Sequence, residues 1–461
     1  MKKDRGFNSE RRTFMRAAAG FAGATVFGGL PFRAFAQATE AAKDRCFIFV
    51  YFNGGWDQLL AFDPRDPAVF TGDRVAETRI LPGYDLINDA SYSTRPVQPP
   101  NSNIAFGPAI GRLANHYDLM AVIRGINMNT LAHEVGYRYF LTGKEPSGTA
   151  ARGSSAATEI VAQMKPLVPI PSLAYGVESY NDRWPGSANA LRVTRADDLL
   201  LTLSPSSVEF DSEIEKQLLD MRGQPTTAEA AAYDSRGLLS TYSTSREQMA
   251  TVLSNKLDTA FRFEAPENAA VRAHYKLPAT KQSSTTYETP AGRAATVATA
   301  LKRGISQCVS INFAGGLDTH FGSQKTHADR LRLGFDALAD LIQDLRTSEH
   351  PKHPGTSFMD HTTIMVFSEF ARTPLINSTG GRDHHLANSC ALIGAGIKHN
   401  VVFGGTGNIG MAAGVFDLST GQATSTGRNI MPEHVLATVL ASAGLDYDIL
   451  REEPLKPLLD T

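Results

Sequence analysis

The sequence predicts an α/β protein with a mainly parallel sheet between helices. Two observations lead to this class. Short, continuous apolar runs rich in β-branched and aromatic residues recur along the chain, which is typical of strands covered on both faces. An amphipathic helical pattern lies between two of these runs, in the strand–helix–strand order of parallel sheets. The composition agrees, because 42 % of the 461 residues are hydrophobic and 20 % are charged, which excludes a largely disordered chain.

Five apolar runs are the candidate strands, at residues 46–52, 118–126, 308–313, 362–367 and 390–394. Between the third and fourth runs, apolar residues recur at helical spacing and form one face of a predicted helix: Leu331, Phe335, Leu338, Ile342 and Leu345. A second helix is predicted over residues 434–442, because Pro432 is a typical helix start and Gly444 a typical end.

Residues 200 to about 300 differ in character from the rest of the chain. They are polar and rich in Ala, Glu, Ser, Thr and Arg, and they are interrupted by Gly223-Gln224-Pro225 and by a Ser/Thr-rich run at 283–289. We interpret this stretch as a mainly helical insertion that covers the sheet or forms a cap. The whole of residues 37–461 is expected to form one α/β domain that carries it.

Residues 1–36 are predicted to be an export signal. They hold seven basic and two acidic residues, a net charge of +5; since the whole chain carries −2, the remaining residues carry −7. Arg11-Arg12 stand directly before Thr13-Phe14-Met15, and the uncharged run that follows is too short and too rich in Gly for a membrane-spanning helix. Ala34-Phe35-Ala36 is a small-x-small pattern that predicts cleavage before Gln37.

The paired arginines resemble a twin-arginine (Tat) signal, with an ordinary Sec signal as the alternative. We therefore expect the Tat translocase as the partner during export, a periplasmic or secreted location, and no stable membrane anchor after cleavage. The acidic balance of the remaining chain excludes a broadly basic nucleic-acid binder. Cys46, Cys308 and Cys390 lie in or beside strand-like runs, so we expect buried thiols rather than metal ligands.

Three loops that follow candidate strands carry acidic residues. Gly54-Gly55-Trp56-Asp57 follows the first strand, and Gly315-Gly316-Leu317-Asp318-Thr319-His320 follows the third. The fourth strand is followed by residues 368–374 and then by Gly380-Gly381-Arg382-Asp383-His384-His385. Because the carboxyl ends of parallel strands meet at one edge of a sheet, these loops are expected to converge. Carboxylates with imidazoles suit a divalent metal.

Each of these motifs also has a purely structural interpretation. Asp318 can cap a turn with His320 hydrogen-bonded to it, and Asp383 can pair with Arg382 or Arg372. The segment after the second strand holds Thr130 and His133. Thr130 is a candidate nucleophile, although a helix cap explains it equally well and is the interpretation that we favour.

The other histidines and glycine motifs predict no site. His327, His350, His353 and His399 lie in helical or polar loop contexts, which predicts that they are solvated. The Gly-x-Gly-x-x-Gly pattern at 405–410 is followed neither by a convincing helix nor by an acidic residue at the usual distance, so a dinucleotide site is excluded.

The leader, the GGWD and GGLDTH motifs and SEFARTP…GGRDHH together resemble the bacterial family called domain of unknown function 1501, over roughly residues 44–450. This resemblance implies membership of the alkaline-phosphatase-like superfamily, which includes sulfatases and metal-dependent phosphoglycerate mutases. Its fold is a mainly parallel sheet between helices, with metal ligands in strand-end loops. The chain departs from the family pattern at Ala371, where Gly is usual, and at His385, where an aromatic residue is common.

The resemblance also implies the composition of the site. One or two divalent ions (Zn, Mn, Fe or Ca) would be bound by Asp57, Asp318, His320, Asp383 and His384. Thr130 and His133 are nearest to the nucleophile of the superfamily, and His385 or His434 would supply its last histidine. If the protein is a hydrolase of anionic esters, we expect Arg372 or Arg382 to hold the substrate and Glu369 to orient a histidine.

These features predict an exported metal-dependent hydrolase of phosphate or sulfate esters, acting on a small anionic ester. The alternative is a non-catalytic secreted binding or assembly protein on the same scaffold. The lack of an evident nucleophile favours that alternative.

Overall fold

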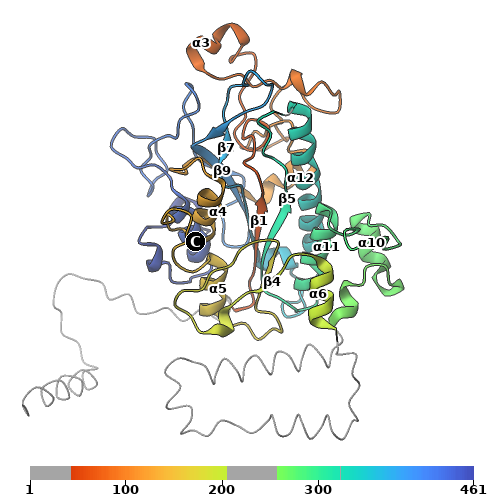
Figure 1. Ribbon diagram of the computed structural model, residues 1–461. Helices are drawn as coiled ribbons and strands as arrows, with labels where there is room; N and C mark the ends of the chain where they lie inside the picture. Colours follow the sequence, from red (N-terminus) through yellow and green to blue (C-terminus); the bar gives the residue numbers. More distant parts are fainter. Residues whose placement is uncertain (1–42, 205–256, 322, 461) are drawn as a thin grey trace, which may run out of the picture. The chain divides into compact units, whose positions relative to one another are not determined.

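The computed structural model describes residues 43–204, 257–321 and 323–460 (Figure 1). The predicted signal at 1–36 and the part of the predicted insertion at 205–256 lie outside the described residues. The described part of the insertion is helical: it contains α6 (Ala196–Leu203), α10 (Ala269–Tyr275) and α11 (Pro290–Lys302). In the described ranges no helix has both the length and the apolar character needed to cross a membrane.

Among the described residues, eight strands form one sheet in the order β10-β2-β9-β6-β1-β5-β3-β4. Their bounds are Cys46–Phe52 for β1, Met120–Asn127 for β2, Ser172–Tyr175 for β3, Leu191–Val193 for β4, Cys308–Ala314 for β5, Thr362–Phe367 for β6, Ala387–Gly394 for β9 and Val401–Gly404 for β10. The pairs β2·β9 and β9·β6 are antiparallel, and the other five pairs are parallel. The mainly parallel α/β sheet is confirmed, and all five candidate strands are present.

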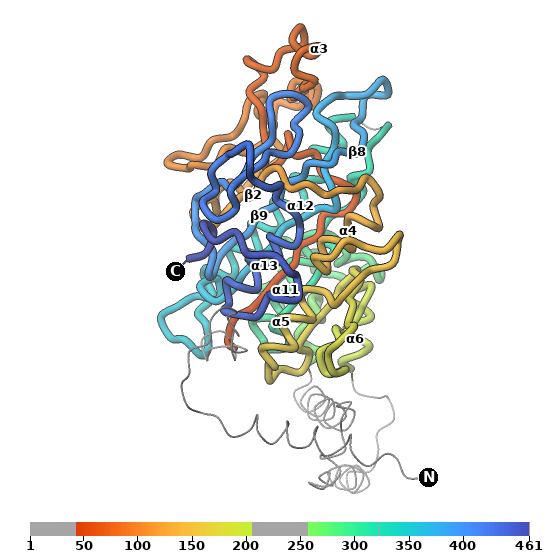
Figure 2. Tube along the Cα trace, turned by 90° about the vertical axis from the view of Figure 1, so that its left-hand side faces the viewer, coloured from red at the N-terminus to blue at the C-terminus, as the bar shows by residue number. Residues whose placement is uncertain are grey.

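The central strand β1 is buried on both faces. Ile48, Val50 and Phe52 pack into a core with α11 and α12 (Gln324–Thr347). Phe47, Phe49 and Tyr51 pack into a second core with α4 (His133–Thr142), α5 (Ala156–Met164) and α13 (Pro432–Ala441). Figure 1 shows α11 and α12 on one side of β1, with α4 and α5 on the other. Figure 2 looks onto the second side, where α13 contacts α4 and α5.

Helix α12 connects β5 to β6, which are the two parallel neighbours of β1. All five apolar residues of its predicted face are fully buried. The helix begins after Ser323, whose hydroxyl accepts a hydrogen bond from the Thr326 amide at 3.2 Å. At the middle of the helix, Gly334 lies so close to β1 that an added Cβ would stand 2.5 Å from the Phe52 ring. The predicted strand–helix–strand unit is therefore confirmed.

The remaining elements are short. They are α3 (Val75–Thr78), the strand pair β7 (Ala371–Arg372) and β8 (His384–His385), and 3-10 helices at Gly72–Arg74, Asp85–Ile87, Gly111–Leu119, Gly186–Ala188, Leu257–Phe261, Pro266–Asn268, Phe358–His361, Asp448–Leu450 and Lys456–Leu458. The three cysteines are buried and free, as predicted.

The direction of β9 places the loops of interest at one edge of the sheet. Since β9 runs antiparallel to β6, the segment 368–386 leaves the carboxyl end of β6 and stays at that edge until β9 begins. The carboxyl ends of β1, β5 and β2 point the same way. The segments that follow these four strands therefore approach one another.

Candidate metal centre

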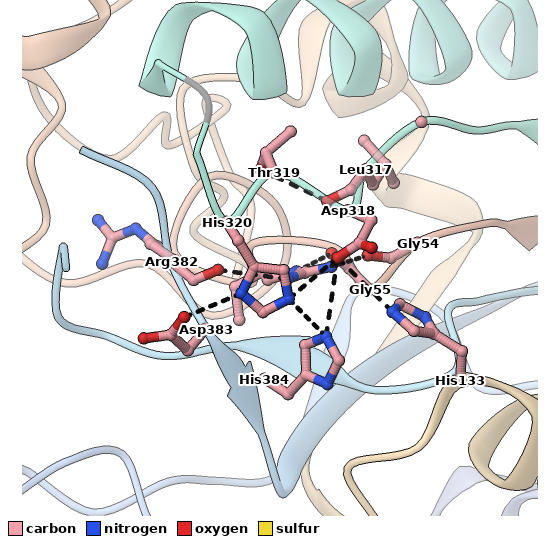
Figure 3. Close-up of polar contacts among 12 residues, drawn as sticks. Gly54, Gly55, His133, Leu317, Asp318, Thr319, His320, Arg382, Asp383 and His384 are labelled. Carbon is pink, nitrogen blue, oxygen red and sulfur yellow. Dashed lines mark hydrogen bonds and ion pairs between the residues drawn. The ribbon is translucent and has the colours of Figure 1, made fainter. Parts of the chain in front are cut away.

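Four side chains from three of these segments converge at the carboxyl edge (Figure 3). His133 is the first residue of α4, Asp318 and His320 follow β5, and His384 lies in β8. Asp318 Oδ1 lies 3.1 Å from His320 Nε2, 3.6 Å from His133 Nε2 and 3.7 Å from His384 Nε2. The Nε2 atoms of His320 and His384 are 2.9 Å apart. We call His133, Asp318, His320 and His384 the carboxyl-edge cluster.

Each imidazole in this cluster is held through its other ring nitrogen. The Nδ1 of His133 lies 2.7 Å from Glu369 Oε1, and the Nδ1 of His320 lies 2.9 Å from Asp383 Oδ1. The Nδ1 of His384 lies 2.6 Å from a backbone carbonyl oxygen, that of Leu131. Because all three partners are acceptors, each Nδ1 carries the proton and each Nε2 presents its lone pair to the cluster.

The spacing of the donors fits a metal ion. Donors bound about 2.0–2.1 Å from a tetrahedral ion lie about 3.3 Å from one another. The three separations from Asp318 Oδ1 and the one between His320 and His384 run from 2.9 to 3.7 Å. The group whose ligand atoms all lie within 4.8 Å of one another is His133, Asp318 and His384, with His320 beside it. Two lone pairs 2.9 Å apart repel each other unless a cation or proton lies between them. The Nε2 of His133 is buried and has no hydrogen-bond partner among the described residues. Three nitrogen donors suit Zn, Mn or Fe better than Ca, which prefers oxygen ligands.

Arg372 holds Asp318 in place. Its guanidinium is buried, donates to Asp318 Oδ1 at 2.7 Å and also donates to the backbone carbonyls of Gly54 and Gly55. Burial opposes ionisation of Asp318, but the hydrogen bond and charge of Arg372 outweigh it and lower the pKa of that carboxyl. Gly54 has a φ of +113°, and an added Cβ would lie 2.6 Å from the Asp318 amide nitrogen. A glycine is therefore required where these two loops meet.

Glu369 connects the loops after β1 and β6 to the cluster. It is buried, and its Oε1 accepts from the Gly54 amide at 2.8 Å as well as from His133. The Ser368 hydroxyl donates to Oε2 at 2.9 Å. The hydrogen bond to Glu369 raises the pKa of His133. Glu369 thus orients a histidine, as the sequence predicted.

Asp57 lies outside the cluster, which corrects the ligand role expected for it. Its Oδ2 forms an ion pair with Arg382 Nε at 2.7 Å, and both side chains are 2 % exposed. Its Oδ1 accepts from the Leu59 amide, and its own amide donates to His327 Nε2. Burial raises the pKa of Asp57 although Arg382 opposes this shift. The Asp57 carboxylate points inward because it pairs there with the buried guanidinium of Arg382.

The two arginines expected to hold substrate do not face an open site. Arg382 donates to the carbonyls of Leu81, Pro82 and Thr373, besides its ion pair with Asp57. Arg372 donates to three carbonyls and to Asp318. Since both guanidinium groups are buried and hydrogen-bonded within the protein, the expected anion-binding role is corrected to a positioning role.

Four further candidates lie beside the cluster or away from it. Asp383 is more than half exposed and supports His320 from outside. The Thr130 hydroxyl accepts from the Ala132 amide at 3.1 Å and forms a turn before the true N-cap, Ala132, so the predicted cap lies two residues too early. His385 contacts the Gly410 carbonyl, and His434 is buried 3.2 Å from Glu452, so neither belongs to the carboxyl-edge cluster.

Two histidines predicted to be solvated are buried: His327 and His350. His327 accepts from the Asp57 amide and hydrogen-bonds to Thr319, and burial lowers its pKa to about 3. A sequence signal for His327 existed, because it precedes Leu331 by four residues and so extends the apolar face of α12.

A cavity of about 410 Å³ lies on the outer side of Asp383, between Arg79, Thr373, Asn377 and His385. Arg79 is exposed, and its guanidinium makes no hydrogen bond to the described residues. It ends α3 with a φ of +55°. No motif in the sequence pointed to this residue.

Comparison with known proteins identifies the family but no activity. A family model described as "Protein of unknown function (DUF1501)" matches residues 44–451, so the chain belongs to this family. No curated protein matches the sequence. One similar solved structure is titled "Crystal structure of Ps i-CgsB in complex with k-i-k-neocarrahexaose"; it is 9 % identical, with a TM-score of 0.33, over 89 % of this chain and 77 % of that chain. A likeness this slight carries no argument about fold or function.

Proposed function

We propose that this member of the family is an exported, metal-dependent hydrolase of phosphate or sulfate esters, built on an alkaline-phosphatase-like scaffold. One observation carries the proposal: His133, Asp318 and His384 bring one ligand atom each within 4.8 Å of the others, His320 lies beside them, and every imidazole Nδ1 is held by an acceptor. The mostly parallel sheet with its loops at the carboxyl edge supports the assignment of the scaffold.

The chain's own residues prepare the centre. His133, Asp318 and His384 would hold a divalent ion of the Zn, Mn or Fe class, with His320 beside them. Glu369 keeps His133 oriented, and Asp383 keeps His320 oriented. When bound, such an ion polarises an ester oxygen and stabilises the negative charge on the group being transferred. Arg372 keeps Asp318 ionised, so that a full negative charge is available to the ion.

The cavity beside Asp383 is the proposed substrate site. Arg79 on its wall has free donors, and a guanidinium matches the geometry of a phosphate or sulfate group. Arg79 therefore takes the role that the sequence had given to Arg372 or Arg382. Asp383 lines this cavity and also contacts His320, so an anion bound there would lie next to the carboxyl-edge cluster.

Water is the proposed nucleophile. Within the described residues, no hydroxyl or thiol hydrogen-bonds to the donor atoms of the cluster, and the Thr130 hydroxyl already accepts from a backbone amide. Attack by water requires no covalent intermediate on the protein. Direct transfer to water therefore fits this arrangement better than a serine or threonine mechanism.

Metal analysis of the exported protein tests the centre. Asp318→Asn should release about one divalent ion per chain, because it removes the only carboxylate that the cluster offers. His399→Gln, which changes an exposed histidine outside the cluster, is the matched control. Retention of the ion in both Asp318→Asn and His384→Gln would contradict the assignment.

Turnover separates the proposed hydrolase from the alternative. Aryl phosphate and aryl sulfate esters are the substrates to screen, and activity should be lost with a chelator and in Asp318→Asn. Binding of metal at the cluster without turnover of either ester class would favour a non-catalytic secreted binding or assembly protein. For export, Arg11→Lys with Arg12→Lys should leave the precursor in the cytoplasm, and normal secretion would exclude the twin-arginine route.

A further inference from the structure

A second group of histidines lies at the opposite edge of the sheet. His350 and His353 belong to the loop between α12 and β6, and His361 ends the 3-10 helix directly before β6. One ligand atom from each of the three lies within 4.8 Å of the others. We call His350, His353 and His361 the amino-edge cluster.

This cluster is separate from the candidate metal centre. It adjoins the start of β6, whereas Glu369 and Arg372 follow the end of the same strand. Six strand residues span about 20 Å at 3.3 Å each. Its behaviour can therefore be measured independently of the proposed hydrolase.

The three imidazoles are packed against one another. The ring centroids of His353 and His361 are 4.3 Å apart and the rings are nearly parallel, while those of His350 and His361 are 4.6 Å apart. Burial, with help from the neighbouring rings, lowers the pKa of His350 to about 4. This imidazole is neutral at pH 7, as a metal ligand must be.

Each ring keeps a nitrogen that makes no hydrogen bond within the described residues. These are Nε2 of His350, Nε2 of His353 and Nδ1 of His361, whose Nε2 contacts the Thr356 hydroxyl at 2.9 Å. The His353 Nε2 is buried and lies 3.2 Å from Asp44 Oδ2, without the geometry of a hydrogen bond. A carboxylate thus stands beside an unsatisfied buried nitrogen.

We propose that His350, His353 and His361 form a second, structural site for a divalent transition-metal ion, with Asp44 beside His353 as its supporting carboxylate. Three imidazoles are a donor set that suits Zn²⁺. An ion held there would join the residues just before β1 to the loop that leads into β6, and so would fasten two neighbouring strands at their amino ends.

Lys352 is the competitor of this ion. Its Nζ lies 2.7 Å from Asp44 Oδ1, and its side chain is 63 % exposed, so it can leave the carboxylate without disturbing the core. Removal of this cation should therefore strengthen metal binding. If the cluster served only the lysine–aspartate ion pair, removal of the lysine would not strengthen metal binding.

The experiment uses the mature protein, stripped of metal and titrated with Zn²⁺ alone by calorimetry. The variant Asp318→Asn/His384→Gln disables the candidate centre and should still bind about one Zn²⁺ per chain. Adding His353→Gln and His361→Gln should abolish that binding, and adding His399→Gln in their place should leave it unchanged. Bound Zn²⁺ should also raise the midpoint of thermal unfolding in the first of these variants, because it binds only the folded chain.

Two surface variants keep the test independent of folding. Lys352→Gln should tighten Zn²⁺ binding several-fold, and Asp44→Asn should weaken it about tenfold, as the loss of a ligand or its support does. If the variant that lacks the candidate centre binds no Zn²⁺, or binds it equally well without His353 and His361, the second site does not exist. Either result leaves the proposed hydrolase untouched, because that proposal depends on Asp318.

Discussion

The carboxyl edge of the sheet holds two layers built from the same kinds of residue. In the inner layer, Asp57 pairs with Arg382 and His327 is hydrogen-bonded on both ring nitrogens, all out of contact with solvent. In the outer layer, Asp318 is half exposed and its neighbour His133 has a buried Nε2 without a partner. The aspartate of each layer, Asp57 or Asp318, follows a Gly-Gly pair after a strand.

The difference shows what separates a structural from a functional polar group here. In the inner layer the Asp57 carboxylate is neutralised by Arg382 and both ring nitrogens of His327 have hydrogen-bond partners, so these groups serve the stability of the protein. The outer cluster leaves its Nε2 donors facing one another, an arrangement that is unfavourable without a cation. We therefore expect changes in the inner layer to alter unfolding and changes in the outer layer to alter metal binding.

The largest effect is expected from Arg382→Gln. It leaves the buried Asp57 carboxylate without its cation, which should lower the free energy of unfolding by about 3–5 kcal/mol. Urea unfolding measures this, and the double variant Asp57→Asn/Arg382→Gln should lose less than Arg382→Gln alone. The metal content of Arg382→Gln should stay unchanged. If this variant lost metal but kept normal stability, Asp57 would be assigned to the metal site.

His327 should make the protein less stable in acid. Its folded pKa is about 3, below the ordinary value of 6.5, so the unfolded chain binds the extra proton as the pH falls below about 6.5. Its contribution to stability is complete above that pH and should fall by about 2 kcal/mol at pH 5. Urea unfolding of His327→Gln should show a correspondingly smaller loss between pH 7.5 and pH 5. An identical pH dependence in both proteins would show that His327 is not the cause.

Glu369→Gln should weaken metal binding while leaving the ligands in place. The neutral amide no longer stabilises the proton on His133 Nδ1, and loss of such a supporting partner costs about 10–100-fold in metal affinity. Competition with a chromogenic chelator measures the affinity. Glu178→Gln, in an ion pair with Arg138 away from the cluster, is the control and should bind as the wild type does.

Arg79→Gln should have the smallest effect. The loss of one charge-assisted hydrogen bond to a substrate anion should raise KM about tenfold, while kcat and metal content stay close to those of the wild type. Arg74→Gln, an exposed arginine on the same segment but outside the cavity, is the matched control. Equal KM values for the two variants would remove Arg79 from the proposed substrate site.

The fold was largely predictable because β1, β5 and β6 are continuous apolar runs and α12 keeps a clear helical period. The direction of β9 was not predictable, because a buried apolar run has the same pattern whichever way the strand runs. Convergence of the strand-end loops followed from the sheet. The sequence did not predict which aspartate faces the cluster. That is decided by the ion pairs of Asp57 with Arg382 and of Asp318 with Arg372, which form only in the folded chain.

The position of β1 bears on how the protein is made. It is the first strand to be synthesised, yet it lies between β5 and β6, which begin at Cys308 and Thr362. At about 5–20 residues per second, both edges of this apolar strand stay unpaired for roughly a quarter of a minute to a minute. Until then the nascent chain exposes an unpaired apolar strand, which is the kind of segment prone to aggregation. Export after folding, as the twin-arginine route requires, would keep this vulnerable period inside the cytoplasm.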